Sequence, residues 1–508
     1  MTHQGAAGRA VGPVLRTAVA IVTLVLVAAA CSGDDDDAGS TATPSTTIES
    51  DGDTGPAVTA SAPESADTDP ATASTNVLDQ PVANCFWSEP VNREQSNSQF
   101  PDAGATYWFS SITVPDGAVL RLQGDYPHAR YASFMVYGPD PVTGLPGTPF
   151  DGLADIDIAP DGGSTNPFEV GADRTVEQRS YEVQLVGESV PADEAGRAAN
   201  TLYGVNSGEP AEGDRTQELI YRVYIPDDGR NLLGDTGLPG VTVELADGST
   251  LTGEEACAAL QSDPVLPVDQ LPSLGEDAYA TLRALGEQPT HPAQLPVVFR
   301  RFFNAQHATF STFYTGTDRE PELAAVDATP FGGYFSNLDN QYVLAVIDRD
   351  LGPDPEAGTV AVITGTAPTT PRTSDGAEVM EDGDLRYWSV CQNESSVTTR
   401  VADCLYDEQV PRDADGRYTV VVSRPEDRPE NATPECGVGW LDWGPGDGVD
   451  RPEYGLVIVR HMLPSAGYET TVANVATPGD EAAVLGEVLP QATYETPEVF
   501  EERGCADG

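Results

Sequence analysis

Short runs of alternating or β-branched apolar residues recur along most of the chain and are separated by Gly, Pro, Asp and Asn. Six runs occupy the first half: Tyr107–Val114, Val119–Gln123, Tyr131–Tyr137, Tyr181–Leu185, Leu219–Ile225 and Val241–Leu245. Five more occupy the second half: Tyr342–Ile347, Val360–Thr364, Tyr387–Cys391, Tyr418–Ser423 and Leu456–His461. A period of two is typical of half-buried strands, and many short strands with frequent turn residues indicate a sandwich or a barrel. The pattern therefore predicts an all-β fold.

The two series of runs also match each other in spacing. The matched segments, first half against second half, are Gly117–Pro127 with Gly358–Pro368, Arg130–Ser133 with Arg386–Ser389, Leu153–Asp155 with Val401–Asp403, Arg179–Val183 with Arg417–Val420, and Ile220–Pro226 with Ile458–Pro464. Each match is weak alone, but five matches in one order predict an internal duplication. We expect two tandem jelly-roll-like β-sandwich domains, at residues 79–263 and 307–508.

Helical signals lie between the two series. Thr252–Glu255 and Ser273–Glu276 both have the spacing of a capping box, which starts a helix. The first should open a helix through Leu260 and the second a helix that ends near Gly286. A third helix is expected at Val297–Ala305. Residues 264–306 are therefore predicted to form a short helical connector.

The N-terminus has the three zones of a secretory signal, with Arg9 and Arg16 before an apolar run that ends in small residues. Cys31 follows directly, and this resembles the lipobox of bacterial lipoproteins, although Ala28 stands where Leu is usual. The resemblance implies a signal peptide at residues 1–30 and a palmitate-type lipid on Cys31 that anchors the protein at the outer face of the cell membrane. An ordinary signal peptide or one membrane-spanning helix is the alternative. Residues 31–78 lack large apolar side chains and are predicted to be a disordered tether.

Six of the seven cysteines remain if Cys31 carries lipid. An even number in an oxidising compartment predicts three disulfides, although six cysteines allow fifteen pairings. The pairing we favour is Cys85 with Cys257, Cys391 with Cys404, and Cys436 with Cys505. A zinc site is the alternative, but no close Cys or His pairing supports it. No metal and no cofactor are expected.

The formal net charge is −55, and all 26 basic residues are Arg because the chain contains no Lys. Nucleic-acid binding requires a basic face, so nucleic acid is excluded as a partner. Chemistry that depends on a lysine amine is excluded as well. Such an acidic surface keeps a protein soluble and repels anionic lipid head groups.

Two kinds of polar feature are candidates for a ligand site. His128 and Arg130 follow the turn at Pro127, where His128 either takes part in binding or caps the end of a strand. Arg130 with Asp155 recurs as Arg386 with Asp403, and each pair would either hold a ligand carboxylate or sugar, or join a strand to a loop as a buried ion pair. The recurrence favours the structural role. Arg222 and Arg460, which alternate with apolar residues on their strands, have the same character.

Trp440 and Trp443 are expected in a Gly-rich loop. If exposed, they would form a stacking surface for sugar rings, and if buried, part of the core, which is the interpretation we favour.

The Arg-Tyr-x-Ser segments at Arg130 and Arg386, each after a Gly-x6-Gly strand, resemble a jelly-roll domain of unknown function that occurs in pairs in bacterial secreted proteins. Segments such as Tyr126–Tyr131 and Asn166–Phe168 resemble those of uncharacterised actinobacterial lipoproteins. The resemblance covers residues 80–480 and implies a tandem β-sandwich. It implies no activity.

These features predict a non-catalytic lipoprotein of the cell envelope that binds a ligand or forms surface structure. Its expected partners are the membrane, through the lipid on Cys31, and a glycan or another envelope component; a second copy of the chain is a further candidate. The alternative is an exported hydrolase that acts on envelope polymers or carbohydrate with a pair of carboxylates.

Overall fold

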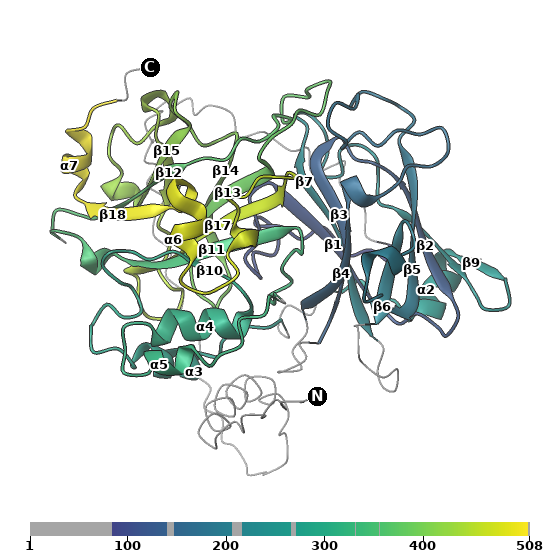
Figure 1. Cartoon of the computed structure of the whole chain (residues 1–508), viewed down its shortest axis with the longest axis horizontal. Helices are drawn as coiled ribbons and strands as arrows, with labels where there is room; N and C mark the ends of the chain where they lie inside the picture. Colours follow the sequence, from purple (N-terminus) through teal and green to yellow (C-terminus); the bar gives the residue numbers. More distant parts are fainter. Residues whose placement is uncertain are drawn as a thin grey trace, which may run out of the picture.

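The computed structural model describes residues 84–139, 147–205, 216–265, 271–330, 332–354 and 356–505. Within these residues the strands form four sheets, which pack in two pairs as two β-sandwiches (Figure 1). The fold is all-β, as the alternating pattern predicted. The predicted signal peptide, Cys31 and the predicted tether lie outside the described residues. No described helix is long and apolar enough to cross a bilayer.

The first sandwich consists of a four-stranded sheet in the order β1-β7-β3-β4 and a five-stranded sheet in the order β6-β5-β2-β8-β9. Neighbouring strands are antiparallel, except that β6 runs parallel to β5. The strands are β1 (Ala105–Ile112), β2 (Val119–Asp125), β3 (Ala129–Gly138), β4 (Thr148–Ala154), β5 (Ser180–Ser189), β6 (Thr201–Val205), β7 (Gln217–Pro226), β8 (Gly240–Glu244) and β9 (Thr250–Thr252).

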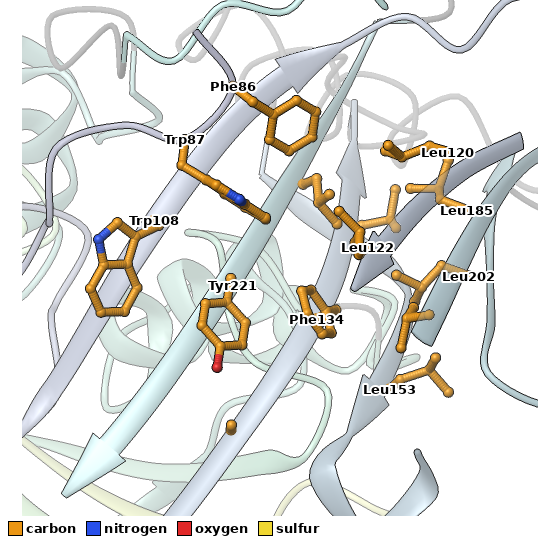
Figure 2. Close-up of a cluster of buried hydrophobic side chains, with 14 of the residues drawn as sticks. Phe86, Trp87, Trp108, Leu120, Leu122, Phe134, Leu153, Leu185, Leu202 and Tyr221 are labelled. Carbon is orange, nitrogen blue, oxygen red and sulfur yellow. The ribbon is translucent and has the colours of Figure 1, made fainter. Parts of the chain in front are cut away.

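The two sheets of this sandwich enclose an aromatic and aliphatic core (Figure 2). Trp108, Phe134 and Tyr221 project from the first sheet and stack on one another. Leu122 and Leu202, both fully buried, project from the second sheet toward them. Each core residue alternates with an outward-facing neighbour, so the period of two in the sequence decides which side chains enter the core.

The second sandwich repeats this arrangement. Its sheets have the orders β10-β11-β17-β13-β14 and β16-β15-β12-β18, and β16 runs parallel to β15. The strands are β10 (Arg300–Arg301), β11 (Asn340–Asp348), β12 (Val360–Thr366), β13 (Leu385–Asn393), β14 (Val401–Tyr406), β15 (Arg417–Ser423), β16 (Gly439–Asp442), β17 (Tyr454–Pro464) and β18 (Gln491–Glu495).

The strand orders of the two sandwiches correspond except at the edge strands β9 and β10, which have no counterpart. β1-β7-β3-β4 matches β11-β17-β13-β14, and β6-β5-β2-β8 matches β16-β15-β12-β18. The register corresponds too, since Tyr107 pairs with Arg222 in the first sandwich and Tyr342 with Arg460 in the second. This equivalence is one of topology; the origin of both halves from one duplicated segment stays a prediction.

The helices are short and lie outside the sheets. They are α2 (Gly253–Leu260), α3 (Glu276–Arg283), α4 (Ala305–Tyr314), α5 (Glu320–Leu323), α6 (Glu481–Leu485) and α7 (Pro497–Glu501). The helix predicted at Val297–Ala305 is wrong: Arg300 and Arg301 extend the sheet beside β11, and α4 starts only at Ala305. Asn304 decides this start, because its side chain caps the main-chain amide of His307. Helices α3, α4 and α5 lie together beside the second sandwich (Figure 1).

The three disulfides are those predicted. Cys85 joins Cys257, Cys391 joins Cys404, and Cys436 joins Cys505. The first closes 172 residues of chain and connects the segment before β1 to α2. The second joins directly paired residues of β13 and β14.

Candidate functional site

The two sandwiches contact each other through equivalent sheets, β1-β7-β3-β4 and β11-β17-β13-β14. Residues that point away from one sandwich core meet those that point away from the other. Tyr131 and Tyr224 of the first sandwich form one buried cluster with Tyr387 and Met462 of the second. The rings of Tyr224 and Tyr387 meet edge to face, with centroids 5.4 Å apart. The outward side chains of the central strands are therefore interface residues.

Buried ion pairs cross this interface in both directions. Arg130, on β3, is completely buried and lies 3.0 Å from the Oδ2 atom of Asp407, and it also contacts the carboxylate of Glu408. In the other direction, Arg386 on β13 lies 3.0 Å from the Oδ1 atom of Asp155. Burial raises the pKa of Asp155 to about 6, although Arg386 acts in the opposite direction. Each arginine thus neutralises a carboxylate of the other sandwich.

This exchange corrects the expected pairing within each half. Asp155 and Asp407 are the equivalent residues, because each follows the strand beside its arginine strand and accepts a main-chain amide there, from Ala132 and Trp388 respectively. Asp403, the expected partner of Arg386, instead lies 3.0 Å from Arg93. The shared Ala-Asp pair led the sequence comparison to match Asp155 with Asp403, whereas the structure makes Asp407 the equivalent residue.

Two equivalent loops cross the interface in the same reciprocal way. The carbonyl of Phe100 accepts a 2.8 Å hydrogen bond from Arg460, and the carbonyl of Phe335 accepts one of the same length from Arg222. Both phenylalanines have positive φ, at 52° and 53°, which turns these carbonyls toward the arginines. The two loops border the space between the sandwiches.

A cavity of about 160 Å³ lies in that space. One water needs ~10–15 Å³ on the same measure, so the cavity has room for a small organic molecule. Its floor consists of three cross-strand pairs on β11 and β17: Tyr342 with Arg460, Leu344 with Ile458, and Val346 with Leu456. These pairs extend over four residues of strand, or about 13 Å.

The other walls come from the first sandwich and from α4. Tyr107, Phe109 and Ile220 contribute apolar faces from β1 and β7. Helix α4 contributes small residues at a spacing of three and four, so they share one face of the helix. They are Ala305, Ala308, Thr309 and Thr312. Phe313 of the same helix also lines the cavity, but these four side chains are small and leave space beside them.

Two buried arginines form one end of the cavity. The guanidinium carbon of Arg460 lies 5.9 Å from the Tyr342 ring centroid, and Arg222 lines the same cavity. Burial raises the pKa of Tyr342 to about 12, although both arginines act in the opposite direction. Arg460 lies 3.6 Å from Asp102, while Arg222 has no carboxylate within 4 Å among the residues that the structure describes. Arg222 is only 2% exposed, and its Nε and Nη1 atoms have no acceptor in those same residues.

Arg222 is held instead by aromatic rings. Tyr107 and Tyr137 each lie with the ring centroid 5.4 Å from the guanidinium carbon, and Nη2 also donates to the hydroxyl of Tyr137. Asp339 is a more distant counter-charge that accepts a 2.6 Å hydrogen bond from Tyr131. Burial raises the pKa of Asp339 to about 6, and no ion pair within 4 Å joins Asp339 to Arg222 in the described part of the chain. The positive charge of Arg222 is therefore poorly compensated.

The opposite end of the cavity is acidic. Glu394 follows β13 at the level of Leu456, and its Oε2 atom has no hydrogen-bond donor among the described residues. Asp447 also lines this end, but Tyr279, Arg283 and three main-chain amides occupy its oxygens. The long axis of the cavity therefore runs from a cationic to an anionic end.

The remaining candidate residues lie elsewhere. His128 is half-buried before β3, where its main chain pairs with Gly234 and Asp227, and burial lowers its pKa to about 4. Trp443 is fully buried in the second core, whereas Trp440 is half-buried on β16 rather than in a loop. The guanidinium carbon of Arg428 lies 4.3 Å from the Trp440 ring centroid. The two tryptophans do not form one exposed stacking surface.

No family model matches the chain, and neither does any curated protein. Solved structures that resemble it include an uncharacterized protein from Burkholderia cenocepacia, at 15% identity and a TM-score of 0.44, covering 82% of this chain and 84% of that one. The VPA0106 protein of Vibrio parahaemolyticus matches at 11% identity and a TM-score of 0.32, covering 77% of this chain and 89% of that one. Similarities this low transfer no function.

Proposed function

We propose that this protein is a lipid-anchored binding protein of the cell envelope, with its ligand site in the cavity between the two sandwiches. The cavity itself carries the proposal. It is bordered by aromatic and aliphatic side chains and by a few buried polar groups, which is the usual composition of a small-molecule site. The signal sequence, the Cys31 motif and three disulfides support an extracytoplasmic location.

The cavity favours binding over hydrolysis. A hydrolase of the alternative kind requires two carboxylates free to exchange protons. Of the two carboxylates at the acidic end, Asp447 is held by five donors, which leaves Glu394 alone. A non-catalytic role agrees better with this arrangement.

A cavity-filling variant tests the proposal. We would screen small amphipathic compounds for thermal stabilisation of the full chain carrying Cys31→Ala, which removes the lipid and the need for detergent. A ligand at 100 times its Kd should stabilise the fold by about 2.7 kcal/mol. Ala308→Phe places a ring in the cavity and should abolish this effect, whereas Ala325→Phe, at an exposed position after α5, should not. The proposal fails if no compound stabilises the protein or if Ala308→Phe binds as the parent does.

A further inference from the structure

Resting on the proposed function, we infer that the ligand carries a single carboxylate, which Arg222 binds, and an apolar body that lies along the cavity floor. The positive charge at the arginine end of the cavity is not fully balanced by a nearby negative charge in the described residues. The guanidinium of Arg222 is 98% removed from solvent and lacks a close carboxylate within the described part of the chain. A buried charge without a partner is costly, so a bound anion would supply what the protein does not.

The equivalent arginine shows what is missing at Arg222. Asp102 stands beside Arg460, and the residue at the corresponding place near Arg222 is Asn337. The side-chain oxygen of Asn337 accepts from the Tyr131 hydroxyl as Asp102 accepts from that of Tyr387, but the Asn337 side chain carries no charge. Both Asn337 and Arg222 line the cavity, so a ligand carboxylate at this end would take the role that Asp102 plays for Arg460.

A carboxylate suits the free donors of Arg222. Its Nε and Nη1 atoms are the two without acceptors, while Nη2 is occupied by Phe335 and Tyr137. Because the N–H groups of Nε and Nη1 point in different directions, a carboxylate would accept from one of them, and such a charge-assisted bond is stronger than a neutral one. Tyr107, which is half-buried, covers one face of Arg222 and would shift to admit the ligand.

The rest of the cavity determines that the remainder of the ligand is apolar and that it carries no second negative charge. The pairs Leu344 with Ile458 and Val346 with Leu456 provide an apolar floor that ends about 13 Å from the Tyr342–Arg460 pair. Glu394 at the far end would repel a second anionic group. The structure therefore favours a monocarboxylate over a dicarboxylate.

Binding of four eight-carbon compounds to the Cys31→Ala chain tests this inference by calorimetry at pH 7: octanoate, octan-1-ol, octylamine and octanedioate. We expect octanoate to bind about 10- to 100-fold more tightly than octan-1-ol, as an added charge-assisted interaction implies. Octanedioate should bind at least tenfold more weakly than octanoate. Equal affinity of octanoate and octan-1-ol, blocked by Ala308→Phe, would overturn the inference and leave the proposed function standing. Preference for octylamine would also overturn it, in favour of Glu394.

Two variants isolate the contribution of Arg222. Arg222→Gln should bind octanoate and octan-1-ol with equal affinity, because the charge is gone. Asn337→Asp keeps Arg222 and adds a carboxylate beside it, as at Asp102, so octanoate affinity should fall at least tenfold while octan-1-ol affinity is retained. This second variant decides the matter if Arg222→Gln does not fold. Unchanged octanoate affinity in Asn337→Asp would contradict the inference.

Discussion

Arg222 and Arg460 occupy equivalent places on β7 and β17, yet their surroundings differ in one decisive respect. Each donates to the carbonyl of a phenylalanine from the opposite half, and each is almost completely buried. Arg460 also has Asp102 at 3.6 Å, whereas Arg222 is flanked by tyrosine rings. Arg460 therefore has a carboxylate partner in the interface, whereas no close carboxylate among the described residues balances the positive charge of Arg222.

This contrast shows how two similar halves can share architecture and differ in role. The reciprocal pairs of Arg130 with Asp407 and Arg386 with Asp155 hold the sandwiches together from both sides. Because these ion pairs already hold the two sandwiches together, the halves can differ at other equivalent positions without losing that contact. Asn337 carries a neutral amide where Asp102 carries a carboxylate, so the two equivalent places differ in charge.

The largest effect is expected at the two interface arginines. Arg130→Met should lower the free energy of unfolding by about 3–5 kcal/mol, because Asp407 would be left buried without its partner. Arg386→Met should cost less, about 1–3 kcal/mol, since Asp155 has a pKa near 6 and protonates readily. Urea unfolding at pH 7 measures both. An equal or greater loss in Arg386→Met would contradict this difference between the halves.

The disulfide of Cys391 with Cys404 is the next difference, because Met135 and Gly152 hold the equivalent paired positions in the first sandwich. Removing it as Cys391→Ala with Cys404→Ala should cost about 2–3 kcal/mol, given a sequence separation of 13. Cys391→Met with Cys404→Gly should recover part of the loss by restoring the packing of the first half. Denaturant midpoints compare the two, and identical midpoints would show that the packing has no effect.

The paired and unpaired arginines should also differ in stability. Arg460→Gln leaves the buried carboxylate of Asp102 without its arginine partner and should lower the free energy of unfolding by about 2–3 kcal/mol. Arg222→Gln removes a poorly compensated charge and should cost less than about 1 kcal/mol. Thermal and urea unfolding of both variants, without ligand, provides the measurement. The comparison breaks down if Arg222→Gln is the more destabilised of the two.

The last effect appears only when the pH is changed, and it concerns the pair Val223 and His461, which are equivalent on β7 and β17. Burial lowers the pKa of His461 to about 4. The unfolded chain therefore binds this proton more readily, so the stability present above pH 6.5 is lost as the pH falls toward 4. Relative to His461→Val, the parent should lose about 2–3 kcal/mol between pH 7 and 4. Parallel pH profiles of unfolding for the two proteins would refute this.

Much of the fold could be predicted from the sequence because it depends on local spacing. The alternation in runs such as Tyr131–Tyr137 specifies which side chains can face a core, and the strands were found there. The predicted runs did not include β4, β6, β9, β10, β14, β16 and β18. Of these, β6 and β16 are short and each pairs in parallel with a strand already assigned. The helix expected at Val297–Ala305 failed because Arg300 and Arg301 pair with β11, a contact that local propensity does not contain.

The candidate site could be predicted only in part. Arg222 and Arg460 stood out as charged residues in apolar strands, but their spacing is the same in both halves. The difference between them lies in Asp102 and Asn337, each more than 100 residues away in sequence. The small-residue face of α4, from Ala305 to Thr312, was the one further signal, and it could have indicated a cavity beneath that helix.

The sequence by itself determined the period of the strands, the turns between them, the even set of cysteines and the recurrence of one pattern in both halves. Those features depend on neighbours along the chain, and their physics is local. Which arginine meets which carboxylate was decided only when two sheets packed face to face, because an ion pair forms between groups that are close in space. The same packing left Arg222 without a close carboxylate among the described residues and created the cavity beside it.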